Sequence, residues 1–87
     1  MTMKYWVYIL LCSDVRRSLY TGYTTDINRR IYEHNYNNKG AKYTRGKRPV
    51  KLLYEEEFDN KSDAMKREYA IKQLSRHQKI NLAFPKK

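Results

Sequence analysis

The stretch that decides the fold is YTGYTTDINRRIYEHN, residues 20–35. It begins with residues typical of a short strand, passes through a glycine turn, and indicates a helix from about Asp26 to Tyr36. Asp26 is a suitable N-cap, because its carboxylate can accept a hydrogen bond from a first-turn N–H that has no helical partner. The sequence therefore predicts a strand, a turn and a helix in direct succession.

The inner face of this helix combines apolar and ionisable residues. At about 100° per residue, one stripe contains Ile27, Arg30, Ile31 and His34. The two isoleucines belong in a core, whereas a guanidinium and an imidazole normally avoid one. We therefore expect this helix to face a functional site as well as the core.

Two strands are expected to form a hairpin around this stretch. Residues 5–11 are a continuous aromatic and β-branched run, which indicates a central strand buried on both faces. Residues 12–18 are polar and indicate a loop, and residues 19–23 return as an antiparallel strand.

The register of the hairpin places two tyrosines together. If the loop is centred on Val15 without a bulge, Leu10 opposes Tyr20, and Tyr8 lies on the same face as Tyr20, two residues along. The two phenol hydroxyls would then project from one side of the hairpin.

The second half of the chain predicts one more strand and two more helices. Residues 37–40 (NNKG) tolerate a left-handed backbone and end the first helix, and a basic loop then runs to Pro49. The elements that follow are a strand from Val50 to about Phe58, a helix from about Ser62 to Ser75 capped by Asn60 or Ser62, and a short basic helix from Arg76 to Ala83.

The third strand shows a period of two. Val50, Leu52 and Tyr54 alternate with polar or second-face residues, which is typical of a strand with one buried face. The acidic run at residues 55–57 indicates the solvated end of this strand rather than a metal site.

One carboxylate lies inside the apolar stripe of the second long helix. The stripe contains Ala64, Ile71 and Leu74, with Met65 at its margin, and Glu68 falls between them. A lone carboxylate costs several kcal/mol to remove from water unless a cation or hydrogen-bond donors meet it. Glu68 therefore needs an explanation that Glu33, on the first helix, does not.

Length and composition limit the class of protein. The chain has 87 residues, so we expect one domain over residues 1–87, with its core at about 4–83 and a tail at 84–87. The expected fold class is α/β in the α+β sense, a small three-stranded antiparallel sheet flanked by helices in the order β-β-α-β-α-(α). Cys12 is the single cysteine, and no apolar run approaches the roughly 20 residues of a membrane span. We expect a cytoplasmic protein with no membrane partner.

The charge is strongly basic and unevenly distributed. Lys and Arg number 19 and Asp and Glu 9, giving a net charge of +10, and no acid occurs between His34 and Tyr54. A basic segment of this kind attracts polyanions, and nucleic acid is the foremost candidate. The same charge would also be explained by a solvated loop or by binding to an acidic membrane surface. Tyr36 and Tyr43 lie within this basic segment and could stack on bases. The candidate nucleic-acid-binding residues are Lys39, Lys42, Tyr43, Arg45, Lys47 and Arg48.

Four residues form the candidate site: Tyr8 and Tyr20 on the hairpin, Arg30 on the first helix and Glu68 on the second. Each has a structural explanation when taken alone. A buried tyrosine commonly has a satisfied hydroxyl, Arg30 could extend along the core, and Glu68 could pair with Arg30. A lone histidine such as His34 is more often packed than catalytic.

The spacing of two tyrosine-containing triplets favours a functional explanation over the structural ones. They are VYI, residues 7–9, and YTG, residues 20–22; Arg30 follows eight residues after the second triplet, and His34 four residues later. This combined spacing resembles that of the GIY-YIG nuclease family and is closest to its small single-domain bacterial members.

The resemblance extends over roughly residues 4–83. Ala64 and Glu68, followed by Ile71, are similar to the family's helix with its metal-binding glutamate, and KYTRG at residues 42–46 is similar to a loop of the small members. The departures are Val7 for glycine in the first triplet and Thr21 for isoleucine in the second, both at strand positions.

The resemblance implies divalent-metal-dependent hydrolysis of phosphodiester bonds on the three-stranded sheet. It implies these roles: Tyr8 activates or positions the attacking water, Tyr20 is the second tyrosine of the site, Arg30 binds phosphate, His34 assists the same step as Tyr8, and Glu68 is the single metal ligand. Asn81 is the nearest candidate for a late asparagine of the family's site.

The chemistry is consistent with those roles. A free phenol has a pKa of about 10, so Tyr8 can act as a base only if nearby cations lower its pKa. Arg30 can bind two phosphate oxygens bidentately. Mg²⁺ is usually held by one or two carboxylates together with water and substrate phosphate, so Glu68 fits a site for one Mg²⁺ or Mn²⁺ ion.

The expected function is thus a metal-dependent DNA endonuclease, with a role in DNA repair or recombination. Binding should be salt-sensitive and largely independent of sequence, so a protein partner could supply specificity. The alternative is a non-catalytic nucleic-acid-binding module on the same fold, and a third reading is an RNA-directed or ribosome-associated role.

Overall fold

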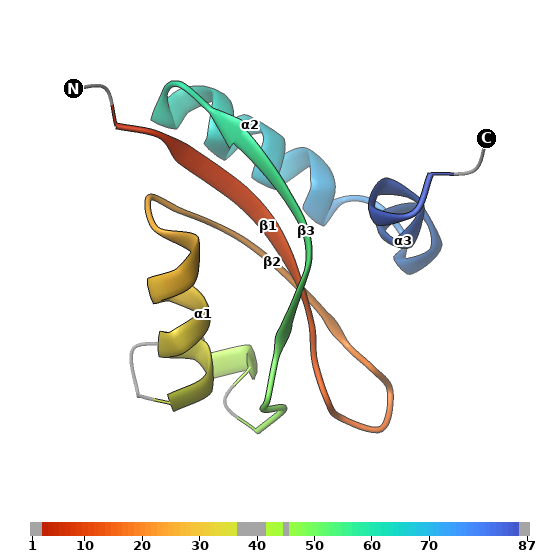
Figure 1. Ribbon diagram of the computed structural model, residues 1–87. Helices are drawn as coiled ribbons and strands as arrows, with labels where there is room; N and C mark the ends of the chain where they lie inside the picture. The colour runs from red at the N-terminus through yellow and green to blue at the C-terminus, as the bar shows by residue number, and fades with distance from the viewer. Residues whose placement is uncertain (1–2, 37–41, 45, 86–87) are drawn as a thin grey trace.

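The computed structural model describes residues 3–36, 42–44 and 46–85. The chain forms three strands and three α-helices in the predicted order, together with one short 3-10 helix (Figure 1). The elements are β1 (Tyr5–Leu11), β2 (Leu19–Thr24), α1 (Ile27–Tyr36), the 3-10 helix η1 (Lys42–Thr44), β3 (Lys51–Phe58), α2 (Lys61–Lys72) and α3 (Arg76–Ala83).

The sheet is antiparallel with the strand order β2-β1-β3, so β1 is central and β2 is an edge strand. Leu10 pairs with Tyr20, and Tyr8 pairs with Gly22. The predicted hairpin register is therefore confirmed, and Tyr8 and Tyr20 share one face of the sheet.

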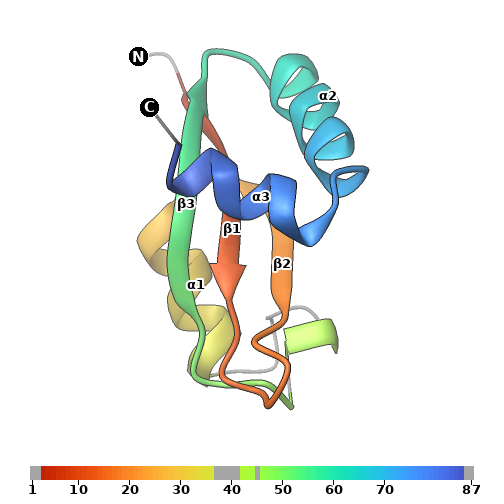
Figure 2. The same ribbon diagram turned by 90° about the vertical axis from the view of Figure 1, so that its right-hand side faces the viewer.

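The two faces of the sheet are covered by different helices. Figure 1 shows α1 on one side of the sheet and α2 with α3 on the other, and Figure 2 shows α3 crossing in front of the strands. Alternation along β1 sends Val7 and Ile9 toward α2, and Tyr8 and Leu10 toward α1. The core therefore consists of two thin layers, one on each face.

The predicted period of two in the third strand is wrong at its centre. Ile9 pairs with Tyr54 but Leu10 pairs with Leu52, so Leu53 is an extra residue in a bulge. The bulge reverses the pattern: Leu53 and Tyr54 both pack on the α2 face, whereas Leu52 is largely exposed. The buried Val50 lies just before the strand, in the layer on the α1 side.

Side-chain caps define the ends of the helices. Asp26 Oδ1 accepts a hydrogen bond from the Arg29 N–H at 3.1 Å, which confirms it as the cap of α1. Asn60, rather than Ser62, caps α2. The second helix ends at Lys72 instead of Ser75, because Ser75 has an extended backbone and forms a capping box for α3. The helix-ending segment 37–40 lies outside the described residues.

The acidic run at residues 55–57 is only partly solvated. Glu55 and Glu57 are exposed as expected, but Glu56 forms an ion pair with Arg67 of α2 at 3.2 Å and accepts a hydrogen bond from Tyr54. This run therefore helps to attach α2 to β3. No helix in the described part of the chain is long and apolar enough to span a bilayer.

Candidate active site

Gly22 determines where the Tyr8 phenol lies. A Cβ atom at Gly22 would be 2.6 Å from the Tyr8 hydroxyl oxygen and 2.8 Å from its Cζ atom, both closer than van der Waals contact allows. The ring of Tyr8 therefore lies directly against the backbone of β2, its pairing partner. The Tyr20 ring is adjacent, with its centroid 6.4 Å from that of Tyr8.

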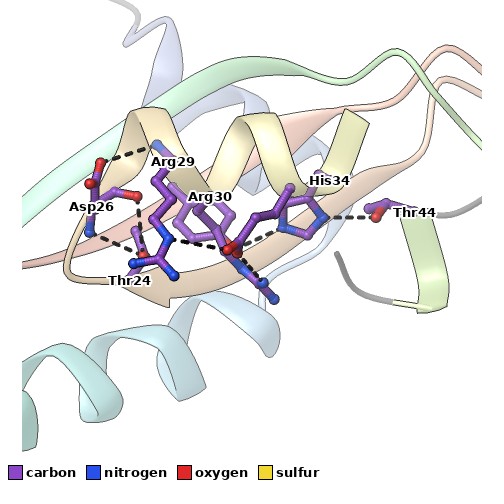
Figure 3. Close-up of polar contacts among 8 residues, drawn as sticks. Thr24, Asp26, Arg29, Arg30, His34 and Thr44 are labelled. Atoms are coloured by element: carbon purple, nitrogen blue, oxygen red, sulfur yellow. Dashed lines mark hydrogen bonds and ion pairs between the residues drawn. The ribbon is translucent and has the colours of Figure 1, made fainter. Parts of the chain in front are cut away.

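His34 connects the phenol to the 3-10 helix. Its Nε2 atom is 3.1 Å from the Tyr8 hydroxyl and its Nδ1 atom is 2.8 Å from Thr44 Oγ1. His34 and Thr44 are both completely buried. Figure 3 shows Arg30 and His34 side by side on α1, with Thr44 beyond the imidazole. Both ring nitrogens are therefore hydrogen-bonded, which fixes the orientation of the ring.

Burial sets the protonation states of these two groups. It lowers the pKa of His34 to about 4, with a further contribution from the positive charges of Arg30 and Arg48. Burial also raises the pKa of Tyr8 to about 12, and this outweighs the hydrogen bond from Arg30. At neutral pH the imidazole is therefore neutral and the phenol is protonated. The cation-lowered pKa that Tyr8 would need to act alone as a base does not occur in the resting protein.

Arg30 is held in place by two partners. Its side chain hydrogen-bonds to Tyr8, and its Nη1 atom is 3.0 Å from a carboxylate oxygen of Glu33. Glu33 also pairs with Arg29 at 3.3 Å, and its side chain is only 12% exposed. Nothing in the sequence marked Glu33 as unusual, yet Glu33 is the acid that orients the arginine. The (i, i+3) spacing on α1 was the available signal.

Arg30 is accessible from the surface. Together with Tyr23, Thr24, Thr25, Asp26, Arg29 and Glu33, it lines a hollow of about 370 Å³ at the start of α1. A phosphate group could reach the guanidinium from this side, where Arg29 adds a second positive charge.

Glu68 approaches the same edge from the opposite face. It lies on α2, which packs against β1 and β2, and its side chain is 18% exposed. Its negative charge makes a small contribution to the raised pKa of Tyr8, behind burial of the phenol. Its ion pair is with Lys72, at 3.5 Å, and Arg30 pairs with Glu33.

The donor set suits a single hard cation. In the part of the chain that the structure describes, no three His, Cys, Asp or Glu side chains gather into a metal cage. A single, mostly buried carboxylate is compatible with Mg²⁺, which usually keeps several waters and adds substrate phosphate oxygens. Glu68 therefore fits the expected metal ligand.

Three of the residues predicted to bind nucleic acid, Tyr43, Lys47 and Arg48, are described by the structure and lie next to the site. Tyr43 is half-exposed and its ring centroid is 5.9 Å from that of Tyr20. The Lys47 ammonium lies 3.5 Å from the Tyr43 ring centroid, so it covers one face of the ring expected to stack on bases. Arg48 is near enough to His34 to lower its pKa. Lys39, Arg45 and the side chain of Lys42 lie outside the described residues.

Two further residues complete the comparison with the sequence. Thr44 was not singled out as a site residue, although it lies in the KYTRG loop that carries part of the resemblance. Asn81 is half-buried in α3, which packs against β3, the strand at the other edge of the sheet from β2.

The sequence of the chain matches a known protein family. A family model described as the GIY-YIG catalytic domain matches residues 4–81. The chain therefore belongs to the GIY-YIG family, which confirms the resemblance drawn from the tyrosine triplets.

Within this family the chain is similar to small proteins of the UPF0213 group, which occur in archaea as well as bacteria. It is 56% identical over 79 residues to UPF0213 protein SSP2268 of Staphylococcus saprophyticus, covering 91% of this chain and 93% of that protein. It is 62% identical over 73 residues to UPF0213 protein VNG_2274C of Halobacterium salinarum, covering 84% and 91%. The solution NMR structure of UPF0213 protein BH0048 from Bacillus halodurans matches with a TM-score of 0.59 and 49% identity, covering 97% of this chain and 86% of that one.

Proposed function

We propose that this protein is a metal-dependent endonuclease that hydrolyses phosphodiester bonds in DNA. The observation that carries the proposal is the 3.1 Å contact between the Tyr8 hydroxyl and His34 Nε2, with the charges of Arg30 and Glu68 both acting on the pKa of the phenol. A nucleophile-activating group, a phosphate-binding cation and a metal-binding acid are the three components that the reaction needs.

Arg30 binds the scissile phosphate in this proposal. Its planar guanidinium can donate two parallel hydrogen bonds to non-bridging oxygens, and it balances the charge that develops on them. The ion pair with Glu33 keeps the guanidinium in place before substrate arrives, so little reorganisation is needed at the moment of reaction.

Tyr8 and His34 move the proton of the attacking water. The neutral imidazole has one N–H and one lone pair. When Nδ1–H donates to Thr44 Oγ1, Nε2 is free to accept the phenolic proton of Tyr8. Tyr8 can then take a proton from water as it passes its own to His34, which becomes an imidazolium beside the phosphate. The relay needs no free phenolate beforehand. Because the pKa of His34 is about 4, the imidazolium depends on the negative charge of the bound phosphate to stabilise it.

Glu68 would hold the cofactor, one Mg²⁺ or Mn²⁺ ion. Such an ion, when bound, acidifies a water molecule and stabilises negative charge on phosphate oxygens. The remaining contribution of the chain is positional: α2 places the carboxylate on the opposite side of the β2 edge from α1.

The alternative function is a nucleic-acid-binding module without catalytic activity. The basic surface next to the site favours it as well, because Lys47 and Arg48 would bind phosphate whether or not it is cleaved. The two functions differ in what happens when the site residues are changed.

A cleavage assay separates them. Labelled branched, nicked, duplex and single-stranded DNA, with a matched RNA, would be incubated with Mg²⁺ or Mn²⁺. We expect wild-type cleavage, at least about a hundredfold lower activity in Glu68→Gln and Arg30→Ala, and unchanged activity in Glu57→Gln, an exposed acid on β3. Preference for branched DNA would support a role in repair or recombination. Glu68→Gln with full activity and a native circular dichroism spectrum would refute the one-metal proposal.

A further inference from the structure

A second cleft has three basic lining residues to which no role is assigned above, and it shares Tyr43 with the candidate nucleic-acid-binding surface. It lies between the β1–β2 loop, residues 12–18, and α3, and has a volume of about 290 Å³. Figure 2 looks onto α3 and shows η1 and the loop below it. The lining residues are Arg16, Ser18, Leu19, Tyr43, Arg76 and Lys79. We call this the α3 cleft.

The α3 cleft concentrates positive charge without an acid to balance it. Three of its lining residues are cations and none is a carboxylate. Among the described residues, no ion pair involves Arg16, Arg76 or Lys79. Asp14 lies in the same loop, but its two oxygens accept hydrogen bonds from the N–H and the hydroxyl of Ser18. Like charges gathered in this way repel one another, and an anionic ligand relieves the repulsion.

A direct contact fixes the two sides of the cleft. Arg76 Nη1 donates a hydrogen bond to the backbone carbonyl of Arg17 at 2.5 Å, across 59 residues of sequence. Arg17 has a φ of 52°, a left-handed conformation that is unfavourable for a residue other than glycine. The loop therefore keeps an unfavourable backbone conformation at the point where its carbonyl meets α3.

The cleft is continuous with the candidate active site. Tyr43 lines it, the Tyr43 ring contacts that of Tyr20, and the Tyr20 centroid is 5.2 Å from the His34 ring. Lys47 bridges the same boundary, since its ammonium lies over Tyr43 and is 3.5 Å from Ser18 Oγ. Aromatic rings flanked by cations form the kind of surface along which a nucleic-acid strand runs.

We infer that the α3 cleft binds the phosphodiester backbone of the substrate strand beyond the cleavage point, with Arg16 and Lys79 as phosphate ligands. The inference rests on the proposed function for its substrate class, but it concerns a separate surface. The strand passes from Arg30 over the Tyr20 and Tyr43 rings into the cleft. This path lengthens the contact of the domain with one strand.

Two double variants test this inference. Arg16→Ala with Lys79→Ala removes two charges from the cleft. Lys61→Ala with Lys66→Ala removes two charges from exposed positions on α2, which begins at the opposite end of the sheet from the β1–β2 loop (Figure 2). Binding of a labelled single-stranded oligonucleotide would be followed by fluorescence anisotropy without divalent metal, over a series of salt concentrations. An equally charged polyglutamate serves as competitor.

We expect the cleft variant to bind about tenfold or more weakly at low salt, and the slope of log K against log salt to fall by about 1.4, or about 0.7 for each lost phosphate contact. The control variant should keep the wild-type slope. In cleavage assays the cleft variant should raise KM and leave kcat unchanged. An unchanged slope, an equal loss in the control, or polyglutamate competing as well as DNA would overturn the inference. Failure of all cleavage would leave the binding result standing and would reject only the nuclease function.

Discussion

The two faces of the sheet bury different kinds of side chain, although both faces include residues of the central strand β1. On the α2 face, Val7 and Ile9 pack with Ala64 and Ile71, and these four buried side chains are all apolar. On the α1 face, Tyr8 and Leu10 are buried beside His34 and Thr44, so hydrogen bonds replace part of the apolar contact.

Alternate residues of β1 therefore have different roles. Those that face α2 mainly stabilise the fold, and those that face α1 belong to the candidate site. Apolar burial stabilises by roughly 25 cal/mol per Å², whereas a buried hydrogen bond adds a smaller net amount and is costly mainly when it is broken. We therefore expect changes in the apolar cluster of the α2 face to affect folding, and changes on the α1 face to affect activity and pH dependence. Glu68, the proposed metal ligand, is on α2 but lies outside that cluster.

The largest effect should come from Tyr8→Phe. Removing the hydroxyl interrupts the contact to His34 while keeping the ring against Gly22, so we expect cleavage to fall by about a thousandfold and the fold to persist. Tyr5→Phe is the matched control, because Tyr5 lies on the same strand but packs on the α2 face. Equal rates for wild type and Tyr8→Phe would remove the phenol from the mechanism.

The next effect should come from Ile9→Ala on the apolar face. Ile9 is completely buried, so its truncation should lower the free energy of unfolding by about 3 kcal/mol, as measured by urea denaturation. The cleavage rate per folded molecule should stay the same. Met65→Ala, at a half-exposed site on α2, should cost less than about 0.5 kcal/mol. A folded but inactive Ile9→Ala protein would contradict the division between the faces.

The α1 face should also make stability depend on pH. The folded-state pKa of His34 is about 4, below the ordinary value of 6.5, so the unfolded chain binds a proton more readily. The contribution of His34 to the free energy of unfolding is fully present above pH 6.5 and is lost as the pH falls toward 4. The loss between pH 7 and pH 5 should be about 2 kcal/mol.

Comparing the two histidines isolates this contribution. His34→Asn should flatten the fall in unfolding free energy between pH 7 and pH 5, relative to wild type. His77→Asn should not, because His77 is exposed on α3. Parallel pH curves for wild type and His34→Asn would show that the imidazole is not buried in its neutral form.

The smallest effect on the free energy of unfolding should come from replacing threonine by valine, once on each face of the sheet. Thr21 is buried and pairs with Ile9, and its hydroxyl has no hydrogen-bond partner among the described residues. Thr21→Val should therefore raise the unfolding free energy by about 1 kcal/mol, which is about 4–8 °C in Tm. Thr44→Val should lower it, because that hydroxyl bonds to His34. Calorimetry that gave both changes the same sign would show that the faces do not differ.

Features that depend on local pattern were predictable from the sequence. The hairpin register followed from the loop length, and it placed Tyr8 and Tyr20 on one face. The cap at Asp26 followed from the chemistry of a helix start. Long, strongly patterned segments gave every strand and helix in the right order.

Features that depend on tertiary packing were not predictable in the same way. The bulge at Leu53 cannot be predicted from the sequence because its neighbours, Leu52 and Tyr54, are also largely apolar, so either register buries an apolar residue. The raised pKa of Tyr8 depends on how deeply the ring is buried, which no spacing reveals. The contacts of Thr44 and Arg76 join segments that are distant in sequence, and hydroxyls and arginines are common in this chain.

The absence of a side chain at Gly22 has a practical consequence. The phenolic oxygen of Tyr8 occupies space that a methyl group would need, so Gly22→Ala should displace the hydroxyl while every reactive group remains in the chain. Arg30 and the basic cleft would still hold DNA. The variant would bind its substrate without cleaving it, and it would differ from the wild type by a single methyl group on β2.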